Sequence, residues 1–416
     1  TGVADLRVTG KTSAFQFKDF KGDFSTIGEK LKVGTILEGS VRTVDNNVRI
    51  TTNLIDAEQG HTLWSANYDR QLNNIFQVQD EIARAVVKAL QAQLLQAEDE
   101  PTDRVVDAEA YTAYQQGAFL QGKLTVEDQH SAINYFKQAI SKDPAYAEPL
   151  VGMADANLML ALNMVAIDRD VGIGEATGYL DQALRLNPDS PDAHVAKSQI
   201  KRVNFRDLVG AEMDLKRALE SDPSHINALR NLATIYATQG RFDEAMETLQ
   251  KIINRDPLNT RAYSNYSYYA LAAGNLPVAE QMIGKVLEFS PKSVMANFQL
   301  ARVYMAQGDL PAAEAIIQFE THPVWKNIGL GMIACVKGDK ESGISIANGL
   351  IEQREIFNAS EIYNLCGENE KVFELLQQAA TDRDPALIEM KLSWAMTSLR
   401  NDPRWQEILK LMDLPL

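Results

Sequence analysis

Five prolines fall at nearly regular intervals in the middle of the chain, and their spacing limits the fold more than any other feature. Pro188, Pro223, Pro257 and Pro291 follow one another after 35, 34 and 34 residues, and Pro144 lies 44 residues before Pro188. A fixed period of this length is typical of repeat proteins, in which each repeat packs on the next. We therefore expect a stack of similar units.

Three positions before each proline repeat the same chemistry. The residue twelve positions earlier is always alanine, the residue eight earlier is bulky and apolar, and the residue five earlier is apolar. The three sets are Ala132, Ala176, Ala211, Ala245 and Ala279; Phe136, Leu180, Leu215, Leu249 and Ile283; and Ala139, Ala183, Ala218, Ile252 and Val286. A small residue where two helices cross, with a proline after the second helix, indicates a helical pair in each repeat.

On these residues the chain resembles the tetratricopeptide repeat (TPR) family over most of residues 108–323. The repeat INALRNLATIYATQGRFDEAMETLQKIINRDP carries the signature positions of that family, which are Leu229, Leu232, Ala233, Tyr236, Gly240, Ala245 and Pro257. The second repeat departs from the pattern through the insert NMVAIDRDVGIG, and the sixth ends early at THPVW. Over residues 324–416 the helical rhythm continues without the alanine and proline markers. We interpret this part as degenerate TPR-like helices with a C-terminal cap.

The first 97 residues have a different pattern. DLRVTGKTSAFQF alternates like a strand, and DFSTIGEKLKV places Ile27 and Leu31 at helical spacing. GTILEGSVRTVDNNVRITTNLID predicts a β-hairpin that turns at the adjacent asparagines. On its outgoing strand one face carries Val48, Ile50, Thr52 and Leu54. A third strand and an amphipathic helix over residues 75–90 are expected to follow, so that a helix covers one face of the sheet.

The front segment, over residues 5–95, resembles the TolB-amino-terminal-like (FlgO-like) domain that precedes TPR arrays in many bacterial regulators. TSAFQFK, IGEKLKVGTILEGSVR, VRITTNLIDAEQGHTLWSANYDR and IFQVQDEIA carry this resemblance. Relatives begin the domain with a strand and a helix that would precede Thr1. They attach it to an upstream CadC-type winged-helix DNA-binding domain with one membrane span, or to a nucleotide cyclase such as an adenylate cyclase.

Together these patterns predict a mostly α fold, a right-handed TPR superhelical solenoid preceded by a small α/β domain. We expect the small domain at residues 1–97, lacking its first strand and helix. A linker at 98–107 precedes about six TPR repeats at 108–323, and the degenerate helices with the cap fill 324–416.

No sequence motif predicts a catalytic centre, so we expect no enzyme activity, no cofactor and no metal site. Phosphate loops, nucleophile elbows and dinucleotide fingerprints are all missing from the sequence. The five histidines, which lack metal-ligand spacing, are His61, His130, His194, His225 and His322. Asp45 and Asp56 fit turn positions. Cys335 and Cys366 are too few for a disulfide framework, so we expect buried thiols, and the redox compartment stays open.

The net charge of −15 argues against direct nucleic-acid binding. No apolar run is long enough to cross a bilayer and the residues from Thr1 onward lack a basic-then-apolar pattern, so no membrane span is expected in this segment, although an upstream span could tether it. The resemblance favours the periplasmic side of a membrane-anchored protein, with a cytoplasmic location as the alternative.

The first helix of each TPR lines the inner face of the superhelix, and four positions of that helix point inward. This register selects Asn227, Arg230, Asn231, Thr234, Arg261, Ser264, Asn265, Tyr268, Phe298, Gln299 and Arg302. Amides can bond a peptide backbone, arginines a carboxylate, and aromatic rings an apolar side chain. The alternative is a set of ordinary solvated residues. In the run AYSNYSYYALA we expect Tyr263 and Tyr266 in the core, and Tyr268 and Tyr269 free to meet a ligand.

Two functions from different classes follow. The first is a non-catalytic interaction module, the sensor or scaffold part of a bacterial signalling or transcriptional regulator, which binds a protein or peptide. The second is the regulatory C-terminal part of a signalling enzyme such as an adenylate cyclase. A small-molecule pocket near Trp64 and Tyr68 is a third possibility. The hairpin domain is expected to cap the solenoid, and its open sheet edge predicts a homodimer.

Overall fold

The structure is a computed structural model that describes residues 8–71, 85 and 106–412, apart from positions 19, 45, 46, 124, 165, 206 and 383. The chain divides into two units. The first comprises Thr1–Ala196 and Arg255–Leu258, and the second comprises Lys197–Asn254 and Asn259–Leu416. Within the described ranges no helix has the length and apolarity needed to cross a membrane.

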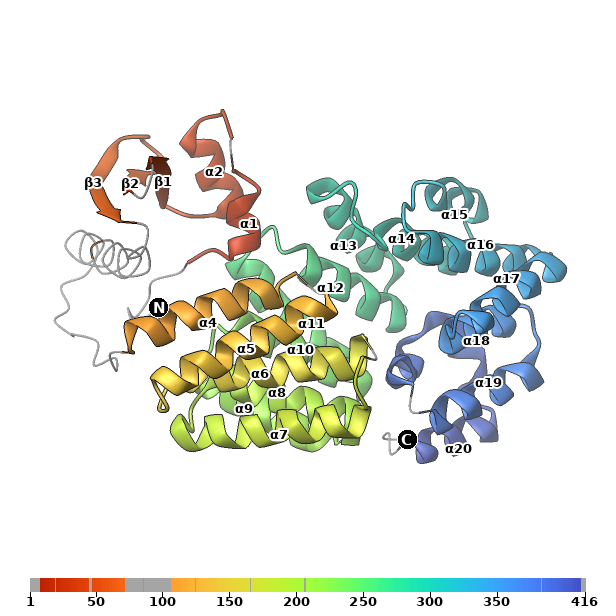
Figure 1. Ribbon diagram of the computed structural model, residues 1–416. Helices are drawn as coiled ribbons and strands as arrows, with labels where there is room; N and C mark the ends of the chain where they lie inside the picture. Colours follow the sequence, from red (N-terminus) through yellow and green to blue (C-terminus); the bar gives the residue numbers. More distant parts are fainter. Residues whose placement is uncertain are drawn as a thin grey trace. The chain divides into compact units, whose positions relative to one another are not determined.

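The front of the first unit holds a three-stranded antiparallel sheet in the order β1-β2-β3 (Figure 1). Its strands are β1 (Thr35–Val44), β2 (Asn47–Asp56) and β3 (Thr62–Gln71). The predicted hairpin is confirmed, because β1 pairs with β2 from Thr35 opposite Asp56 to Val44 opposite Asn47. The predicted face of β2 is buried, with Val48 and Leu54 at 1% and 2% exposure. The turn at Asp45 lies outside the described residues.

The helix α2 (Phe24–Leu31) confirms the spacing of Ile27 and Leu31, which are both buried. The strand-like reading of DLRVTGKTSAFQF is wrong where the structure describes it, since α1 (Lys11–Phe15) is a short helix. Local bonds decide this conformation: the Gly10 carbonyl accepts from the amides of Ser13 and Ala14, both at 3.1 Å. Ser13 is buried, whereas Phe15 is 60% exposed. Aromatic residues favour strands where they pack on a half-buried sheet surface, and the side chain of Phe15 is not buried in this way. The predicted helix over 75–90, except Ala85, and most of the linker at 98–107 lie outside the described residues.

The remaining elements are helices, and consecutive helices pack as pairs (Figure 1). In the first unit these are α4 (Ala108–Gln121), α5 (Val126–Lys142), α6 (Glu148–Leu158), η2 (Met159–Asn163) and α7 (Arg169–Leu186), while α8 (Pro191–Ile200) reaches into the second. The insert predicted in the second repeat begins at Asn163, the last residue of the π-helical turn η2 (Met159–Asn163), and ends in the first turns of α7. The helical side of the fold class is thus as the sequence predicted.

The second unit continues the series of helical pairs from η3 to α20. Its elements are η3 (Lys201–Phe205), α9 (Leu208–Ser221), α10 (Ile226–Thr238), α11 (Phe242–Arg255), α12 (Thr260–Ala272), α13 (Leu276–Phe289), α14 (Ala296–Gln307), α15 (Leu310–Ile317), α16 (Pro323–Lys337), α17 (Lys340–Glu352), α18 (Ile356–Leu365), α19 (Asn369–Thr381), η4 (Pro385–Leu392), η5 (Trp394–Leu399) and α20 (Pro403–Leu411). The degenerate region therefore keeps the paired helices that its rhythm predicted.

The alanines twelve positions before each proline are the crossing points of the helical pairs. Ala132, Ala176, Ala211, Ala245 and Ala279 all have 0% exposure. The prolines fall two residues after the ends of α5, α7, α9, α11 and α13. The residue before proline avoids the helical region, and the C-cap of α9, Asp222, accordingly has φ −134° and ψ 92°. The repeat markers therefore act as predicted.

A second marker survives where the alanines and prolines are lost. The glycines that end the first helices have left-handed φ values between 78° and 90°, and these are Gly240, Gly274, Gly308, Gly338 and Gly367. Residues with a side chain rarely adopt this conformation, whereas glycine does so at no steric cost. The last two belong to the degenerate repeats, so the turn chemistry continues beyond the sequence signature.

Replacing Gly240, which has φ 80°, with alanine is expected to lower the free energy of unfolding by about 1 kcal/mol, because the added Cβ strains the left-handed turn. Gly284 lies inside α13 with open space around it, so Gly284→Ala is the matched control and is expected to stabilise by about 0.5–1 kcal/mol. Urea denaturation midpoints measure both changes. Equal effects at the two positions would contradict this account of the turn.

Candidate functional site

The inner face of the second unit is defined by the eleven predicted residues on α10, α12 and α14. Asn227 and Arg261 are exposed, and Phe298 and Arg302 are buried, with exposures of 1% and 6%. The others are partly buried, namely Arg230, Asn231, Thr234, Ser264, Asn265, Tyr268 and Gln299. They lie on three successive first helices, and their role in binding a ligand stays a prediction.

Side chains on this face bond from one helix to the next. The hydroxyls of Thr234 on α10 and Tyr269 on α12 lie 2.9 Å apart. Ser264 Oγ on α12 donates to Gln299 Oε1 on α14 at 2.8 Å. Tyr269 is only 3% exposed, so the prediction that it is free to meet a ligand is wrong. The sequence assigned it to the open face, but its hydroxyl ties two repeats together.

Arg302 is held by a buried ion pair. Its Nη2 lies 3.2 Å from Glu361 Oε1 on α18, and the two side chains are 7% and 3% exposed. The guanidinium also lies over the rings of Tyr268 and Phe298, 5.4 and 5.5 Å from their centroids. Burial lowers the pKa of Arg302, but Glu361 and Tyr268 raise it further, so the net shift is upward. Arg302 is therefore a charged structural centre of this face.

Phe298 is similarly engaged in packing. Its ring stacks on Trp325 of α16 with the centroids 5.6 Å apart and an angle of 26° between the planes. Its backbone amide donates to the Glu320 carboxylate at 3.4 Å, in the turn that leads to α16. Phe298 thus helps to fasten α14 to α16. The ligand contact predicted for it would require a displacement of this packing.

The C-terminal insert, defined here as residues 384–399, contacts the inner face. It lies between α19 and α20 in sequence, and its η4 helix contacts α10 and α12 as well as α18 and α19. Its buried side chains, each at 1% exposure or less, are Leu387, Met390, Leu392, Ser393 and Met396. One feature of the sequence indicates this role: an apolar stretch between two helices that is too short and irregular to form a further repeat.

Polar contacts fix the insert to α18. Ser393 Oγ donates to the same Glu361 oxygen that pairs with Arg302. Asn364 Nδ2 donates to the Ala395 carbonyl and, at 3.1 Å, to Ser398 Oγ. Trp394 packs against the cluster formed by Ala270, Leu271, Ala279 and Val303. The insert therefore has both apolar and polar anchors.

Glu389 brings a second carboxylate to this face. Burial raises its pKa, and the Glu361 charge acts in the same direction, whereas Arg202, Arg302 and a hydrogen bond with Tyr268 lower it. The net shift is upward. The ionised carboxylate is thus less favourable in the folded chain than in water.

Arg230 belongs to a cluster of like charges. Burial lowers its pKa, and the positive charges of Arg261 and Arg202 add to this effect. Arg230 Nη2 donates to Asn227 Oδ1 at 3.2 Å. Three buried donor atoms, Arg230 Nε, Asn231 Nδ2 and Arg302 Nε, have no hydrogen-bond partner among the described residues. A positive cluster with unused donors is suited to binding carboxylate or carbonyl oxygens.

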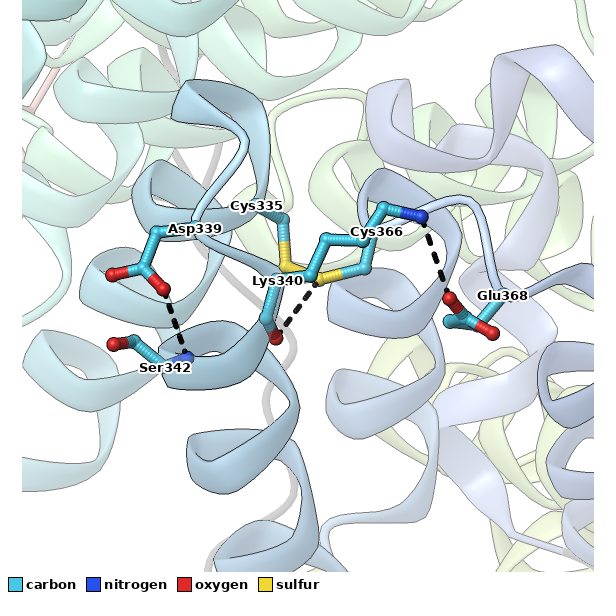
Figure 2. Close-up of a disulfide and its surroundings, with 6 residues drawn as sticks. All are labelled: Cys335, Asp339, Lys340, Ser342, Cys366 and Glu368. Carbon is cyan, nitrogen blue, oxygen red and sulfur yellow. Dashed lines mark hydrogen bonds and ion pairs between the residues drawn. A yellow bond between two sulfur atoms is a disulfide. The ribbon is translucent and has the colours of Figure 1, made fainter.

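A disulfide joins Cys335 and Cys366, so the expectation of buried thiols is wrong, although both cysteines are buried (Figure 2). It links the last turn of α16 to the C-cap of α18, with the Cα atoms 4.6 Å apart. Gly343 on α17 lies against it, since a Cβ there would meet Cys335 Sγ at 2.3 Å. The two cysteines lie 31 residues apart near the ends of two consecutive first helices, three and one residues before the turn glycines Gly338 and Gly367, and this nearness was the signal in the sequence.

The histidines have structural roles where the structure shows their bonds. His225 Nδ1 accepts from the amide of Ala228 at 3.1 Å and caps α10. His194 Nε2 lies 2.9 Å from the carbonyl of Pro188. In the described part of the chain no group of three or more histidine, cysteine, aspartate and glutamate residues could hold a metal ion.

Comparisons with known proteins agree with this architecture. The Tetratricopeptide repeat family matches residues 205–265 and 270–318. "Putative adenylate cyclase 3" of Rhizobium meliloti (strain 1021) is 29% identical over 194 residues, which are 46% of this chain and 33% of that protein. "Cellulose synthase operon protein C" of Xanthomonas axonopodis pv. citri (strain 306) is 31% identical over 80 residues, or 19% of this chain and 5% of that protein. The chain thus spans a third or less of these relatives.

Among solved structures, PilW, a "widely conserved type IV pilus biogenesis factor", aligns with a TM-score of 0.44 and 17% identity, over 51% of this chain and 92% of its own. The fold and the family match define the class: a mostly α protein with tetratricopeptide repeats, preceded by a small three-stranded sheet. TPR proteins are typically non-catalytic interaction modules. Residues 205–265 and 270–318 of this chain are similar to such repeats.

Replacing both Cys335 and Cys366 with serine is expected to destabilise the second unit by about 3 kcal/mol, because the 31-residue loop is then free in the unfolded chain. Thermal unfolding of the double variant, compared with the wild type before and after reduction, measures the effect. Reduction should lower the Tm of the wild type to that of the variant. A wild-type Tm unchanged by complete reduction would show that the disulfide does not support the fold.

Glu389→Gln is expected to stabilise the fold increasingly as the pH rises. Because the folded-state pKa of Glu389 is raised, its neutral form contributes stability below the unfolded pKa, and this contribution is lost as the pH rises through the folded pKa. Glutamine does not titrate, so the gap in Tm between variant and wild type should widen as the pH rises from the ordinary range of a glutamate pKa through the raised folded-state pKa. A gap that stays constant or narrows would contradict the upward shift.

Proposed function

We propose that this chain is a non-catalytic interaction module that binds a peptide or protein segment on the inner face of the second unit. The positive cluster around Arg230 carries this proposal, because it concentrates cations and unused donors in a chain of net charge −15. On a face that contacts only solvent a cluster of positive charges has no role, whereas on a binding face it attracts a ligand of negative charge. The TPR class supports the same function.

The chemistry of the cluster favours a ligand with a carboxylate. The guanidinium of Arg261 is on an exposed residue, and Arg230 retains a donor with no partner in the described structure. A carboxylate can accept from two arginines at once, and Asn231 Nδ2 can bond a peptide carbonyl. An acidic side chain or a chain terminus of the partner fits this end of the face.

We assign the module to a bacterial signalling or transcriptional regulator, as its sensor or scaffold part. The resemblance of the front segment to TolB-amino-terminal-like domains supports an upstream effector such as a CadC-type winged-helix domain. The similarity to "Putative adenylate cyclase 3" supports the alternative, in which the module regulates an upstream cyclase domain. In both versions this segment binds protein and not nucleic acid, and an upstream span could tether it to the membrane.

The disulfide supports a periplasmic location, since disulfides persist in oxidising compartments and are rare in the cytoplasm. The cytoplasmic alternative belongs to the cyclase version of the proposal. A homodimer through the sheet is part of the same proposal. The edge strand β1 pairs only with β2 in the described sheet, and its Leu37 and Val41 are 50% and 61% exposed.

The double substitution Arg230→Ala and Arg261→Ala is expected to weaken partner binding about tenfold, because it removes two charge-assisted hydrogen bonds. Native bacterial extract is passed over immobilised wild type and variant, and the partner retained by the wild type is then titrated against both. Arg302 is left unchanged, since its loss would strand the buried Glu361 charge and destabilise the fold.

The matched control is Arg185→Ala with Arg217→Ala, which removes the same charge from exposed positions of α7 and α9. Partner binding by this control should equal that of the wild type. If both double variants lose the partner equally, general charge explains binding and the inner face is not the site. If neither loses it, binding takes place on another surface.

A further inference from the structure

We propose that the C-terminal insert is a built-in occupant of the inner face, and that the partner is an apolar peptide segment carrying one carboxylate, which takes its place. This inference rests on the proposed function, because it names the ligand class of the same face. The insert is thus a covalently attached copy of what the face recognises.

The insert is held at its two ends independently of its middle. It follows directly after α19, and α20 closes it by packing back on α19. Arg404 Nη1 on α20 lies 2.9 Å from Glu370 Oε1 on α19, and its guanidinium lies over the ring of Phe373, 4.1 Å from the centroid. Trp405 is 2% exposed. Because α20 has these anchors, residues 384–399 can leave the inner face as a closed loop while the last helical pair stays folded.

The insert uses the inner face as a bound peptide would. Its 3₁₀ turns satisfy part of its backbone internally, with weaker geometry than an α-helix provides. Its apolar side chains are buried, and its Ala395 carbonyl accepts from an amide side chain of the first helix α18. Side-chain amides that bond a ligand backbone, with apolar pockets between them, form a common mode of peptide recognition.

The face is incompletely satisfied with the insert in place. Arg230 Nε, Asn231 Nδ2 and Arg302 Nε still have no acceptor in the part of the chain that the structure describes. Within the insert, burial raises the pKa of Glu389, Arg202 and Arg302 lower it, and the charge of Glu361, which already pairs with Arg302, raises it again. A segment whose carboxylate meets Arg230 instead would satisfy unused donors and avoid the repulsion between two carboxylates. The face therefore offers an external ligand contacts that the insert does not make.

Attachment favours the insert over any free segment. A tethered occupant acts at an effective concentration in the millimolar range. The apparent Kd of a free segment of similar chemistry is therefore its intrinsic Kd divided by the fraction of chains in which the insert is open. Substitutions that loosen the insert but leave the inner-face residues of α10, α12 and α14 unchanged should therefore lower the apparent Kd of a free peptide.

The test uses the 416-residue chain and a fluorescent peptide with the sequence of residues 384–400, DPALIEMKLSWAMTSLR. Fluorescence anisotropy measures its Kd for the wild type and for Leu387→Asp with Met390→Asp, which places charges at two buried positions of the insert. We expect the variant to bind the peptide at least tenfold more tightly than the wild type. The same peptide with aspartate at both positions should not bind to either chain.

The matched control is Ala386→Asp with Thr397→Asp, which adds the same charges at exposed positions of the insert. It should bind the peptide as the wild type does. Equal affinities for all three chains, or no binding by the Leu387→Asp and Met390→Asp variant with its circular dichroism intact, would overturn the inference.

Hydrogen exchange on the wild-type chain provides a readout if that variant does not fold. Amides of residues 386–399 should exchange faster than those of α18, α19 and α20, because the insert opens while its neighbours stay folded. Exchange at the same rate as these helices would mean that the insert is permanent core and would overturn the inference. If the insert proves to be permanent core but capture of the native partner still depends on Arg230 and Arg261, the proposed function remains supported. Conversely, tight peptide binding by the loosened variant would support the insert as an occupant of the face, but partner capture independent of both arginines would overturn the carboxylate contact inferred for the partner.

Discussion

The contact on which the rest of the structure depends is the crossing of two helices at a fully buried alanine. With only a methyl group at the crossing point, as at Ala245 with 0% exposure, the two helices approach closely enough for their bulky neighbours to interdigitate. The proline that follows ends the second helix and sends the chain to the next pair. Because this unit recurs, the first helices fall side by side, and residues far apart in sequence come to share one face.

That shared face has the Arg302–Glu361 pair at its centre. The two residues are 59 positions apart, and both are almost fully buried. A buried pair of charges adds little net stability, but the loss of either partner leaves the other stranded, so the pair specifies one arrangement of α14 against α18. Ser393 adds a further bond to Glu361, which couples the C-terminal insert to the same centre. Arrangement of the repeats and occupation of the inner face are thereby linked through one carboxylate.

Local and periodic features of this structure could be predicted from the sequence, because a period of 34 residues and a helix-breaking proline act within one repeat. The hairpin of β1 and β2 and the buried positions of the repeats follow from such patterns. Burial of Tyr269 and Phe298 could not be predicted in this way, because their partners Thr234 and Trp325 belong to neighbouring repeats. Register places a side chain on a face, but it does not say what covers that face.

The degenerate region shows how a repeat array can relax one constraint when another takes its place. Between α16 and α19 the alanine and proline markers are lost, yet the left-handed glycines remain and the Cys335–Cys366 bond joins the two first helices across Gly343. A covalent link needs no close crossing to fix neighbouring helices. The disulfide therefore fixes α18 to α16 covalently. The insert, in contrast, is held against α18 through side-chain contacts with its 3₁₀ turns, such as those of Asn364. Covalently linked repeats with an insert held by non-covalent contacts form the arrangement in which one segment can be exchanged for another without unfolding the repeats.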